Sequence, residues 1–262
     1  MKPSYIYIVL GLGFFLLQCK PKQELDLPKH YEARFSEHEL TIDGKLDEPI
    51  WKSATWSDKF VDIEGFDKPV PKQETQMKMA WDDRYLYIAA RLMEEHLWAT
   101  LTEKDAIVFH DNDFEVFIDP DGDGLNYYEF EINAWGTVFD LFMDKPYKKG
   151  GKADIPWDFQ GLKTAIHLDG TLNDPRDTDS HWVVEMAIPW NAFSANPGIA
   201  PANNDMWRIN FSRVQWDLNI MNESYQKIDK PEYNWVWSPQ GEINMHIPEK
   251  WGYVQFTGQS EN

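Results

Sequence analysis

An alternation of apolar and polar side chains with a period of two recurs from about residue 35 onward, and it constrains the fold more than any other feature of the chain. The segment Phe114–Asp119 places Phe114, Val116 and Ile118 on one face of a strand and Glu115 on the other. Long helical periodicity does not recur in this region. The other segments that alternate in this way are Tyr85–Leu92, Tyr127–Asn133, Val138–Phe142, Leu162–His167, Trp182–Ile188, Met206–Val214 and Trp251–Phe256.

Turn signals separate these segments, among them Asp119–Gly124 (DPDGDG) and Leu168–Gly170 (LDG). Many short strands divided by such turns predict an all-β protein, an antiparallel β-sandwich of the jelly-roll or immunoglobulin-like two-sheet type. Few short helices are expected, near Glu48–Ala54 and Pro189–Phe193. A sandwich of this length forms a single domain, which we expect to cover residues 35–258.

The first residues of the chain are typical of a targeting segment. Lys2 is followed by an apolar run, Tyr5–Leu17, which is shorter than the roughly 20 residues that a membrane-spanning helix needs. The run leads to Cys19, and its ending Leu-Leu-Gln-Cys resembles the bacterial lipobox. We therefore expect residues 1–18 to be a lipoprotein signal peptide, Cys19 to be lipidated, and residues 19–34 to tether the domain to a membrane of the bacterial cell envelope. The alternative is a secreted protein whose cysteine is incidental.

The charge balance excludes several classes of partner. Asp and Glu number 44 against 25 Lys and Arg, so the net charge is −19. Nucleic acids and anionic membrane surfaces need a basic protein surface, and neither is expected as a partner of the folded domain. A single cysteine forms no internal disulfide and no Cys-based zinc site.

Six segments, in the same order along the chain, resemble the family 9 carbohydrate-binding modules. The resemblance extends from about residue 38 to residue 257, and it implies a β-sandwich that binds sugar without catalysing a reaction. The segments are Leu40–Trp51 (LTIDGKLDEPIW), Trp81–Ala90 (WDDRYLYIAA), Asp111–Pro120 (DNDFEVFIDP), Tyr127–Asn133 (YYEFEIN), Trp182–Trp190 (WVVEMAIPW) and Trp207–Arg213 (WRINFSR).

The resemblance also implies a binding mode, in which two aromatic rings hold the end of a glycan and polar groups bond its hydroxyls. Glu115 matches the family's acidic sugar-contacting position, Phe109 lies near one expected stacking ring, and Trp235 or Trp237 lies near the other. An arginine that the family has near Tyr127–Asn133 is absent from this chain, where Glu129 and Glu131 stand instead.

The residue types themselves agree with a site for polysaccharide or oligosaccharide. Flat aromatic rings stack on the apolar faces of sugars, and carboxylates and amides bond the hydroxyls. Trp135, Trp235 and Trp237 are expected in loops or at strand ends. Because residues two apart in a strand share a face, the rings of Trp235 and Trp237 should point to the same side. The remaining candidates are strand residues whose polar groups would meet hydroxyls: Glu115, Glu131, Asn133 and the bidentate donor Arg213.

A calcium site is a further candidate. Asp119, Asp121 and Asp123 have the D-x-D-x-D-G spacing that gathers hard oxygen ligands around Ca²⁺. Position 12 of the loop is Phe130 and the flanking segments are strands, so the loop is not an EF-hand. A simple Asp- and Gly-rich turn explains the same residues.

Three alternatives to sugar binding remain. Related sandwich domains hold haem b through methionine with histidine or lysine, and Met79, Met143, Met245 and His246 are the candidate ligands here. A second alternative is an accessory or scaffold domain of a glycoside hydrolase that has lost sugar binding. The third is an enzyme with paired carboxylates, but 44 acidic residues offer such pairs by chance, and no nucleophile elbow or phosphate-binding loop is present.

Overall fold

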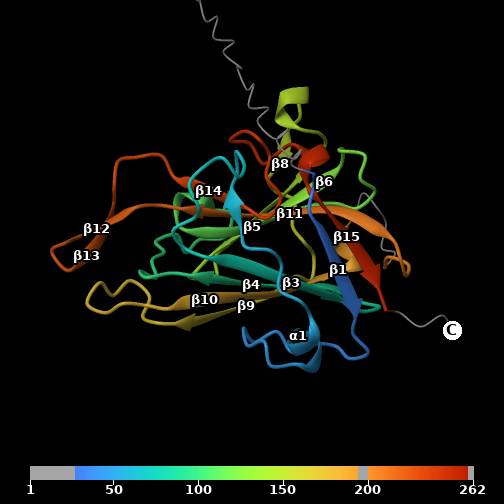
Figure 1. Cartoon of the computed structure of the whole chain (residues 1–262), viewed down its shortest axis with the longest axis horizontal. Coiled ribbons are helices and arrows are strands. Elements are labelled where there is room, and N and C mark those ends of the chain that lie inside the picture. Colours follow the sequence, from blue (N-terminus) through green and yellow to red (C-terminus); the bar gives the residue numbers. More distant parts are fainter. Residues whose placement is uncertain (1–26, 194–199, 259–262) are drawn as a thin grey trace, which may run out of the picture.

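The computed structural model describes residues 27–193 and 200–258, and within them nearly all of the regular secondary structure is β-strand (Figure 1). A five-residue helix, α1 (Pro49–Ser53), and four single 3-10 turns, η1 (Val108–His110), η2 (Tyr147–Lys149), η3 (Trp190–Ala192) and η4 (Pro248–Lys250), interrupt the strands. No helix in these ranges has both the length and the apolar character needed to cross a lipid bilayer. The strands are β1 (His30–Phe35), β2 (Val61–Asp62), β3 (Thr75–Trp81), β4 (Tyr85–Met93), β5 (Asp113–Asp119), β6 (Tyr127–Asn133), β7 (Val138–Met143), β8 (Ala153–Asp154), β9 (Lys163–Asp169), β10 (His181–Pro189), β11 (Met206–Gln215), β12 (Leu218–Met221), β13 (Ser224–Lys227), β14 (Tyr233–Val236) and β15 (Gly252–Thr257).

One curled sheet holds most of these strands in the order β8-β7-β6-β5-β11-β15-β1-β3-β4-β10-β9, with β14 pairing to β11 and β2. It folds over into two layers (Figure 1). We call β5, β6, β7, β11 and β14 the site layer, and β3, β4, β9 and β10 the back layer; β15 and β1 connect them. Neighbouring strands run antiparallel, except that β1 is parallel to both β15 and β3. The predicted β-sandwich is therefore confirmed, with two parallel pairs added.

The main hydrophobic core lies between the two layers, because each strand turns its apolar face inward. In β5 the inward residues are Phe114, Val116 and Ile118, the face that alternation predicted. They contact apolar residues of the back layer. The burial of each large apolar side chain contributes roughly 1.5–3 kcal/mol to the stability of the fold. The buried back-layer residues in this core are Met77, Met79, Trp81, Leu86, Ile88, Ala90, Leu92, Trp182, Val184, Met186 and Ile188.

The sheet begins earlier than expected, at His30, so that residues 30–34 of the expected tether belong to β1. Tyr31 and Ala33 are buried while Glu32 is exposed, which is the alternation of a strand. The segment is short and contains His30, Glu32 and Arg34, and its insertion between β15 and β3 makes it a strand. The expected signal peptide and Cys19 lie outside the described residues.

A buried carboxylate fixes the outer face of the back layer. Glu185 on β10 accepts hydrogen bonds from the indole Nε1 of Trp51 at 2.8 Å and from the backbone N–H groups of Asp43 and Gly44 at 2.9 Å each. Burial raises the pKa of Glu185, and these three donors oppose that rise. Gly44 has a φ of +80°, and a Cβ there would lie 2.9 Å from the backbone nitrogen of His167, so the turn needs glycine.

Replacing Glu185 tests this anchor. We expect Glu185→Met to lower the free energy of unfolding by several kcal/mol, because three buried donors lose their acceptor at about 1–3 kcal/mol each. Glu185→Gln keeps one amide oxygen as an acceptor, so its loss should be clearly smaller. Urea denaturation of the two variants beside the wild type measures both values, and equal stability of the two variants would contradict the assignment.

Candidate functional site

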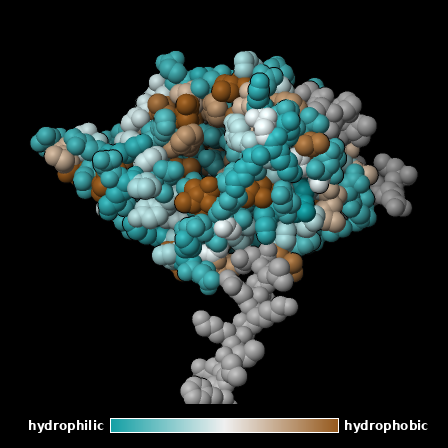
Figure 2. All heavy atoms as spheres, turned by 90° about the horizontal axis from the view of Figure 1, so that it is seen from above, coloured by the Kyte–Doolittle hydropathy of each residue, from teal (hydrophilic) through white to brown (hydrophobic). Residues whose placement is uncertain are grey.

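A hollow of about 410 Å³ opens on the outer face of the site layer, the face turned away from the main core. Its volume lies within the ~300–1,000 Å³ of small-molecule sites. Figure 2 looks onto the molecule from above and shows hydrophobic side chains gathered around a depression in an otherwise largely hydrophilic surface. The lining residues are Ile63, Ile107, Phe109, Glu115, Phe117, Glu129, Glu131, Phe139, Leu141, Tyr147, Ile155, Val214, Glu232, Asn234, Ile243, Asn244, Met245 and His246.

Strand register brings three glutamates together on the floor of this hollow. Glu115 on β5 lies directly opposite Glu131 on β6, and Glu129 follows two residues away on the same face of β6. The neighbouring residues in each strand, such as Val116 and Phe130, point into the main core. Period-two geometry therefore makes β5 and β6 apolar toward the core and acidic toward the hollow.

Burial makes these carboxyls hold their protons more tightly than usual. Burial raises the pKa of Glu115 to about 7. Burial and the nearby Glu115 raise the pKa of Glu129 to about 8. The pKa of Glu131 is raised well above its usual range by burial and by the charges of Glu115 and Asp113. An acid cluster that titrates near neutral pH is typical of a functional site, although structural clusters also occur.

Two carboxylate oxygens in this cluster are buried without a hydrogen-bond partner among the described residues. They are Oδ2 of Asp113 and Oε2 of Glu129. The other oxygen of Asp113 accepts the backbone N–H of Val214 at 3.0 Å. Asp113, Glu115 and Glu131 each place one oxygen within 4.8 Å of the others. Buried polar groups are normally paired, so Glu129, which lines the hollow, has a capacity for hydrogen bonds that the described residues do not use.

Aromatic side chains stand at the rim. Phe109, on η1, is 37% exposed, and Tyr147, on η2, is 50% exposed. The backbone N–H of Phe109 donates to Oε2 of Glu131 at 3.1 Å, which ties this turn to the acidic floor. The ring of Tyr147 meets the ring of His246 edge-on at 4.5 Å. Burial lowers the pKa of His246 to about 4, so its ring is neutral at pH 7.

The structure corrects the expected roles of Trp235 and Trp237. Both indoles face the same side, as predicted, but that side is the main core, where they are 2% and 1% exposed. The reason is register: Trp235 pairs with Arg213 of β11, whose side chain also points between the layers. Trp237 lies over Gly252, where a Cβ would come within 2.1 Å of its ring. Neither ring reaches the hollow.

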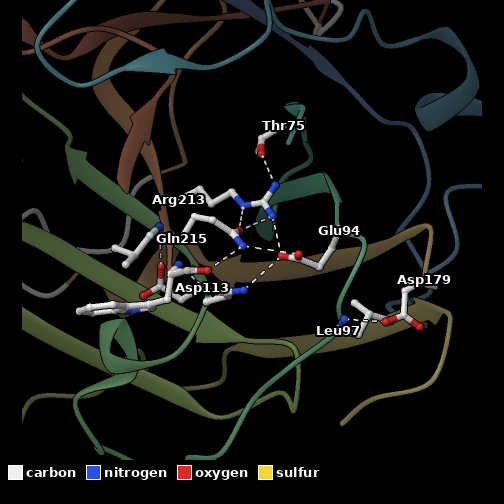
Figure 3. Close-up of polar contacts among 10 residues, drawn as sticks. Thr75, Glu94, Leu97, Asp113, Asp179, Arg213 and Gln215 are labelled. Carbon is white, nitrogen blue, oxygen red and sulfur yellow. Dashed lines mark hydrogen bonds and ion pairs between the residues drawn. The ribbon is translucent and has the colours of Figure 1, made fainter. Parts of the chain in front are cut away.

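Arg213 is likewise a core residue. Its guanidinium is fully buried, pairs with Glu94 at 2.7 Å, and donates to Gln215 and Thr75 (Figure 3). Arg213 thus bridges β11 to both ends of the β3–β4 hairpin, which holds the two layers together. The expectation that it contacts a ligand is corrected, because the guanidinium is buried between the layers, makes four hydrogen bonds there, and does not line the hollow.

Asn133 and Trp135 also lie away from the hollow. Asn133 is fully buried, donates to the carbonyl of Leu101, and accepts the N–H groups of Trp135 and Thr137, so it shapes the β6–β7 turn. Trp135 is 55% exposed, but it lines a second hollow beside Lys104 and Asp140. Of the predicted site residues, the structure brings together Phe109, Glu115 and Glu131; their contact with a ligand stays a prediction.

The Asp119–Gly124 turn gathers carboxylates as expected. Asp119, Asp121 and Asp123 each place one oxygen within 4.8 Å of the others. The two oxygens of Asp119 accept the N–H groups of Gly122 and Gly124 at 3.0 and 2.9 Å, bonds that also explain the turn without an ion. The three oxygens suit Ca²⁺ in type and spacing. Calcium at this turn stays a prediction.

The proposed haem ligands are divided between two clusters. Met79 packs in the main core, whereas Met143 and Met245 belong to a second hydrophobic cluster around Trp251. Nδ1 of His246 lies 2.8 Å from the hydroxyl of Tyr127, so this ring nitrogen is already engaged. Met79 and His246 are thus held by different parts of the fold.

Most lining residues of the hollow were not among the predicted sugar-binding residues, and the polar or exposed aromatic ones include Glu129, Tyr147, Asn234 and His246. Two of them had a signal in the sequence. Glu129 lies two residues from Glu131 in the same strand, so their side chains share a face. Asn234 is adjacent to Trp235, so its side chain points to the opposite face, away from the core. Tyr147 and His246 come from turns whose placement depends on tertiary packing.

The fold and the hollow define a two-layer sandwich domain with a small-molecule-sized hollow on the outer face of the site layer. The chain belongs to the carbohydrate family 9 binding domain-like family, whose model matches residues 42–259. The resemblance found in the sequence is thereby confirmed.

Two curated relatives are carbohydrate-active enzymes. The chain is 30% identical over 158 residues to endo-1,4-beta-xylanase A of Thermoanaerobacterium saccharolyticum and 28% identical over 153 residues to exoglucanase XynX of Acetivibrio thermocellus. These matches cover 60% and 58% of this chain but only 11% and 12% of the relatives. The chain therefore spans about a tenth of the length of the curated relatives it matches.

Solved structures share the fold. A candidate carbohydrate-binding protein from Bacteroides uniformis superposes with a TM-score of 0.64 at 18% identity, over 87% of this chain and 99% of that one. A family 9 carbohydrate-binding module from Caldicellulosiruptor kristjanssonii in complex with cellotriose has a TM-score of 0.58 at 16% identity, over 89% and 96% of the two chains. The glucose complex of a module from the same organism gives 0.59 at 17% identity, over 89% and 98%.

The raised pKa values predict a stability that falls as pH rises. The folded-state pKa of Glu129, about 8, lies above its ordinary value of 4.5, so folding favours the protonated form. This contribution is complete below about pH 4.5 and is lost as pH rises through 8. Each pKa unit is worth about 1.4 kcal/mol, so the loss is of the order of a few kcal/mol. Urea unfolding of the wild type and Glu129→Gln at several pH values should show a flatter dependence in the variant. The control, Glu249→Gln at an exposed position, should follow the wild type.

Proposed function

We propose that this domain binds carbohydrate in the hollow of the site layer and catalyses no reaction itself. The observation that carries the proposal is the meeting of two partly exposed rings, Phe109 and Tyr147, with the acidic floor of Glu115, Glu129 and Glu131 in one sugar-sized hollow. Exposed rings offer stacking surfaces for the apolar face of a pyranose, and carboxylates accept hydrogen bonds from its hydroxyls. Membership of a carbohydrate-binding family supports the same conclusion.

The relatives indicate the setting in which such a domain works. A xylanase and an exoglucanase each contain a region similar to this chain, and similarly folded modules have been solved with cellotriose and glucose. We propose an association with glycoside hydrolases that act on the bound polysaccharide. In this arrangement the domain supplies proximity to the glycan, while a separate catalytic domain or protein cleaves it.

Two aromatic substitutions test the site. We expect Phe109→Ala to weaken glycan binding by about tenfold, since an aromatic contact is worth roughly 0.5–1.5 kcal/mol beyond the buried area. Trp135→Ala removes a more exposed ring outside the hollow and should leave affinity unchanged. A glycan array on residues 20–262 selects the ligand, and isothermal titration of the two variants measures affinity. Binding that is lost in Trp135→Ala and kept in Phe109→Ala would contradict the placement, and binding to no glycan would contradict the function.

We also propose that the domain is held at the bacterial cell envelope, at the outer membrane or cell surface, by a lipid on Cys19. The support is the apolar run Tyr5–Leu17 directly before the only cysteine of the chain. A net charge of −19 would keep the folded domain away from an anionic membrane surface while the lipid anchors it.

Replacing the cysteine tests the anchor. In the full chain expressed in a bacterium, Cys19→Ser should move the protein from the detergent phase to the aqueous phase of a Triton X-114 extraction and abolish labelling by an alkyne-tagged fatty acid. The matched control is Ser4→Ala, which alters a hydroxyl before the apolar run and should stay in the detergent phase. Equal partitioning of Cys19→Ser and the wild type would contradict the proposal.

A further inference from the structure

We infer that the glycan bound in the hollow carries a free amino group, so that the domain prefers an amino sugar to the neutral sugar of the same shape. This inference rests on the proposed function and names the class of sugar that the same site selects. It follows from the charge of the lining, from a buried carboxylate oxygen without a hydrogen-bond partner, and from the partners that other buried carboxylates of the chain have.

The lining is acidic and contains no compensating cation. Four of its residues are glutamates, Glu115, Glu129, Glu131 and Glu232, and none of the lining residues in the described ranges is lysine or arginine. The one titratable base among them, His246, has a partly exposed ring whose Nε2 lies 3.8 Å from Oε2 of Glu129, beyond hydrogen-bond distance. Buried carboxylates are costly unless a positive group or several donors pair with them.

Other buried acids of the chain do have such partners. Glu94 pairs with the buried Arg213 at 2.7 Å, Asp140 lies 3.5 Å from the ammonium of Lys104, and Glu185 accepts three N–H groups. Lys104 also pairs with Asp105 and Asp158, so the acid cluster of the second hollow has its own cation. Unlike Glu94, Asp140 and Glu185, Glu129 on the floor of the first hollow has, among the described residues, neither a Lys or Arg partner nor a hydrogen bond to its Oε2.

An unused acceptor marks where the partner would enter. Glu129 is more than nine-tenths buried and lines the hollow, and its Oε2 has no hydrogen-bond partner among the described residues. An ammonium group has three donors and no acceptor, and a positive charge beside a carboxyl favours its ionised form, so an ammonium suits a floor of glutamates. A sugar hydroxyl also makes a charge-assisted hydrogen bond to a carboxylate, but an ammonium adds the attraction between opposite charges, which gives the amino sugar its advantage over the hydroxyl analogue.

The hollow favours an amino sugar over a bare metal ion. Asp113, whose Oδ2 is unpartnered and which groups with Glu115 and Glu131, does not line the hollow, whereas Glu129 does. A hollow of about 410 Å³ with Phe109 and Tyr147 at its rim fits an organic ring better than a single ion. The ring would lie against the aromatic rim and direct its amino group to the floor.

Two oligosaccharides of matched shape test the inference. The β-1,4-linked trimer of glucosamine differs from cellotriose only in that an amino group replaces the hydroxyl at C2 of each ring. We expect the glucosamine trimer to bind residues 20–262 at least tenfold more tightly than cellotriose, in buffer at pH 6.5 with EDTA and 150 mM salt, measured by isothermal titration. The tri-N-acetylated trimer keeps the nitrogen but has no charge, and it should bind no better than cellotriose.

Variants locate the preference in the hollow. Glu129→Gln should reduce the affinity ratio of the two trimers to near one, whereas Glu249→Gln removes an exposed acid elsewhere and should leave the ratio unchanged. Thermal melting of each variant verifies that the fold is intact. Should Glu129→Gln fail to fold, Glu115→Gln and Glu232→Gln provide the same comparison.

The outcomes separate the inference from the proposed function. If cellotriose binds as tightly as the glucosamine trimer, the inference is overturned and the proposed function stands. A preference that survives in Glu129→Gln, or binding that needs a divalent cation, also overturns the inference. If no glycan of the array binds, including the glucosamine trimer, both fail together.

Discussion

The pairing of β5 with β6, and of β5 with β11, determines how this molecule divides core from site. In each strand one set of side chains packs between the layers and the other set faces the hollow, because successive residues point to opposite faces. Phe114 and Phe130 thereby join the main core, while Glu115 and Glu131 meet across the strand pair on the outer face. A slip of one residue in this register would place the glutamates in the core and the apolar residues in water.

The acidic floor destabilises the folded state locally, and the rest of the fold compensates for this. Burial and mutual repulsion raise the pKa values of Glu115, Glu129 and Glu131, so the folded state disfavours their charged forms. An extensive core between the layers, together with the Arg213–Glu94 pair, maintains the fold around this cluster. Such a cost is typical of binding sites, where groups stay incompletely paired until a ligand arrives.

The candidate site could be predicted in part, and the residues show why. Glu115 and Glu131 were found because an acid inside an apolar alternation must face away from the core or have a partner. Trp235 and Trp237 were assigned to one common side, but alternation does not tell which side faces the core. That choice was made by the pairing of β14 with β11 and by the space above Gly252. The second exposed ring at the hollow, Tyr147, comes from a turn with no periodic signal.

By itself the sequence determined the class of fold, most of the strands, and the two faces of each strand, because these depend on local alternation and turn chemistry. It also determined the family, through segments spread over the whole domain. Only the tertiary structure decided which face of β14 meets the core, that β1 inserts between β15 and β3, and that η1, η2 and the loop before η4 meet over one acidic floor. These features arise from contacts between residues far apart in the chain, and no local pattern encodes which distant strand or turn will lie alongside.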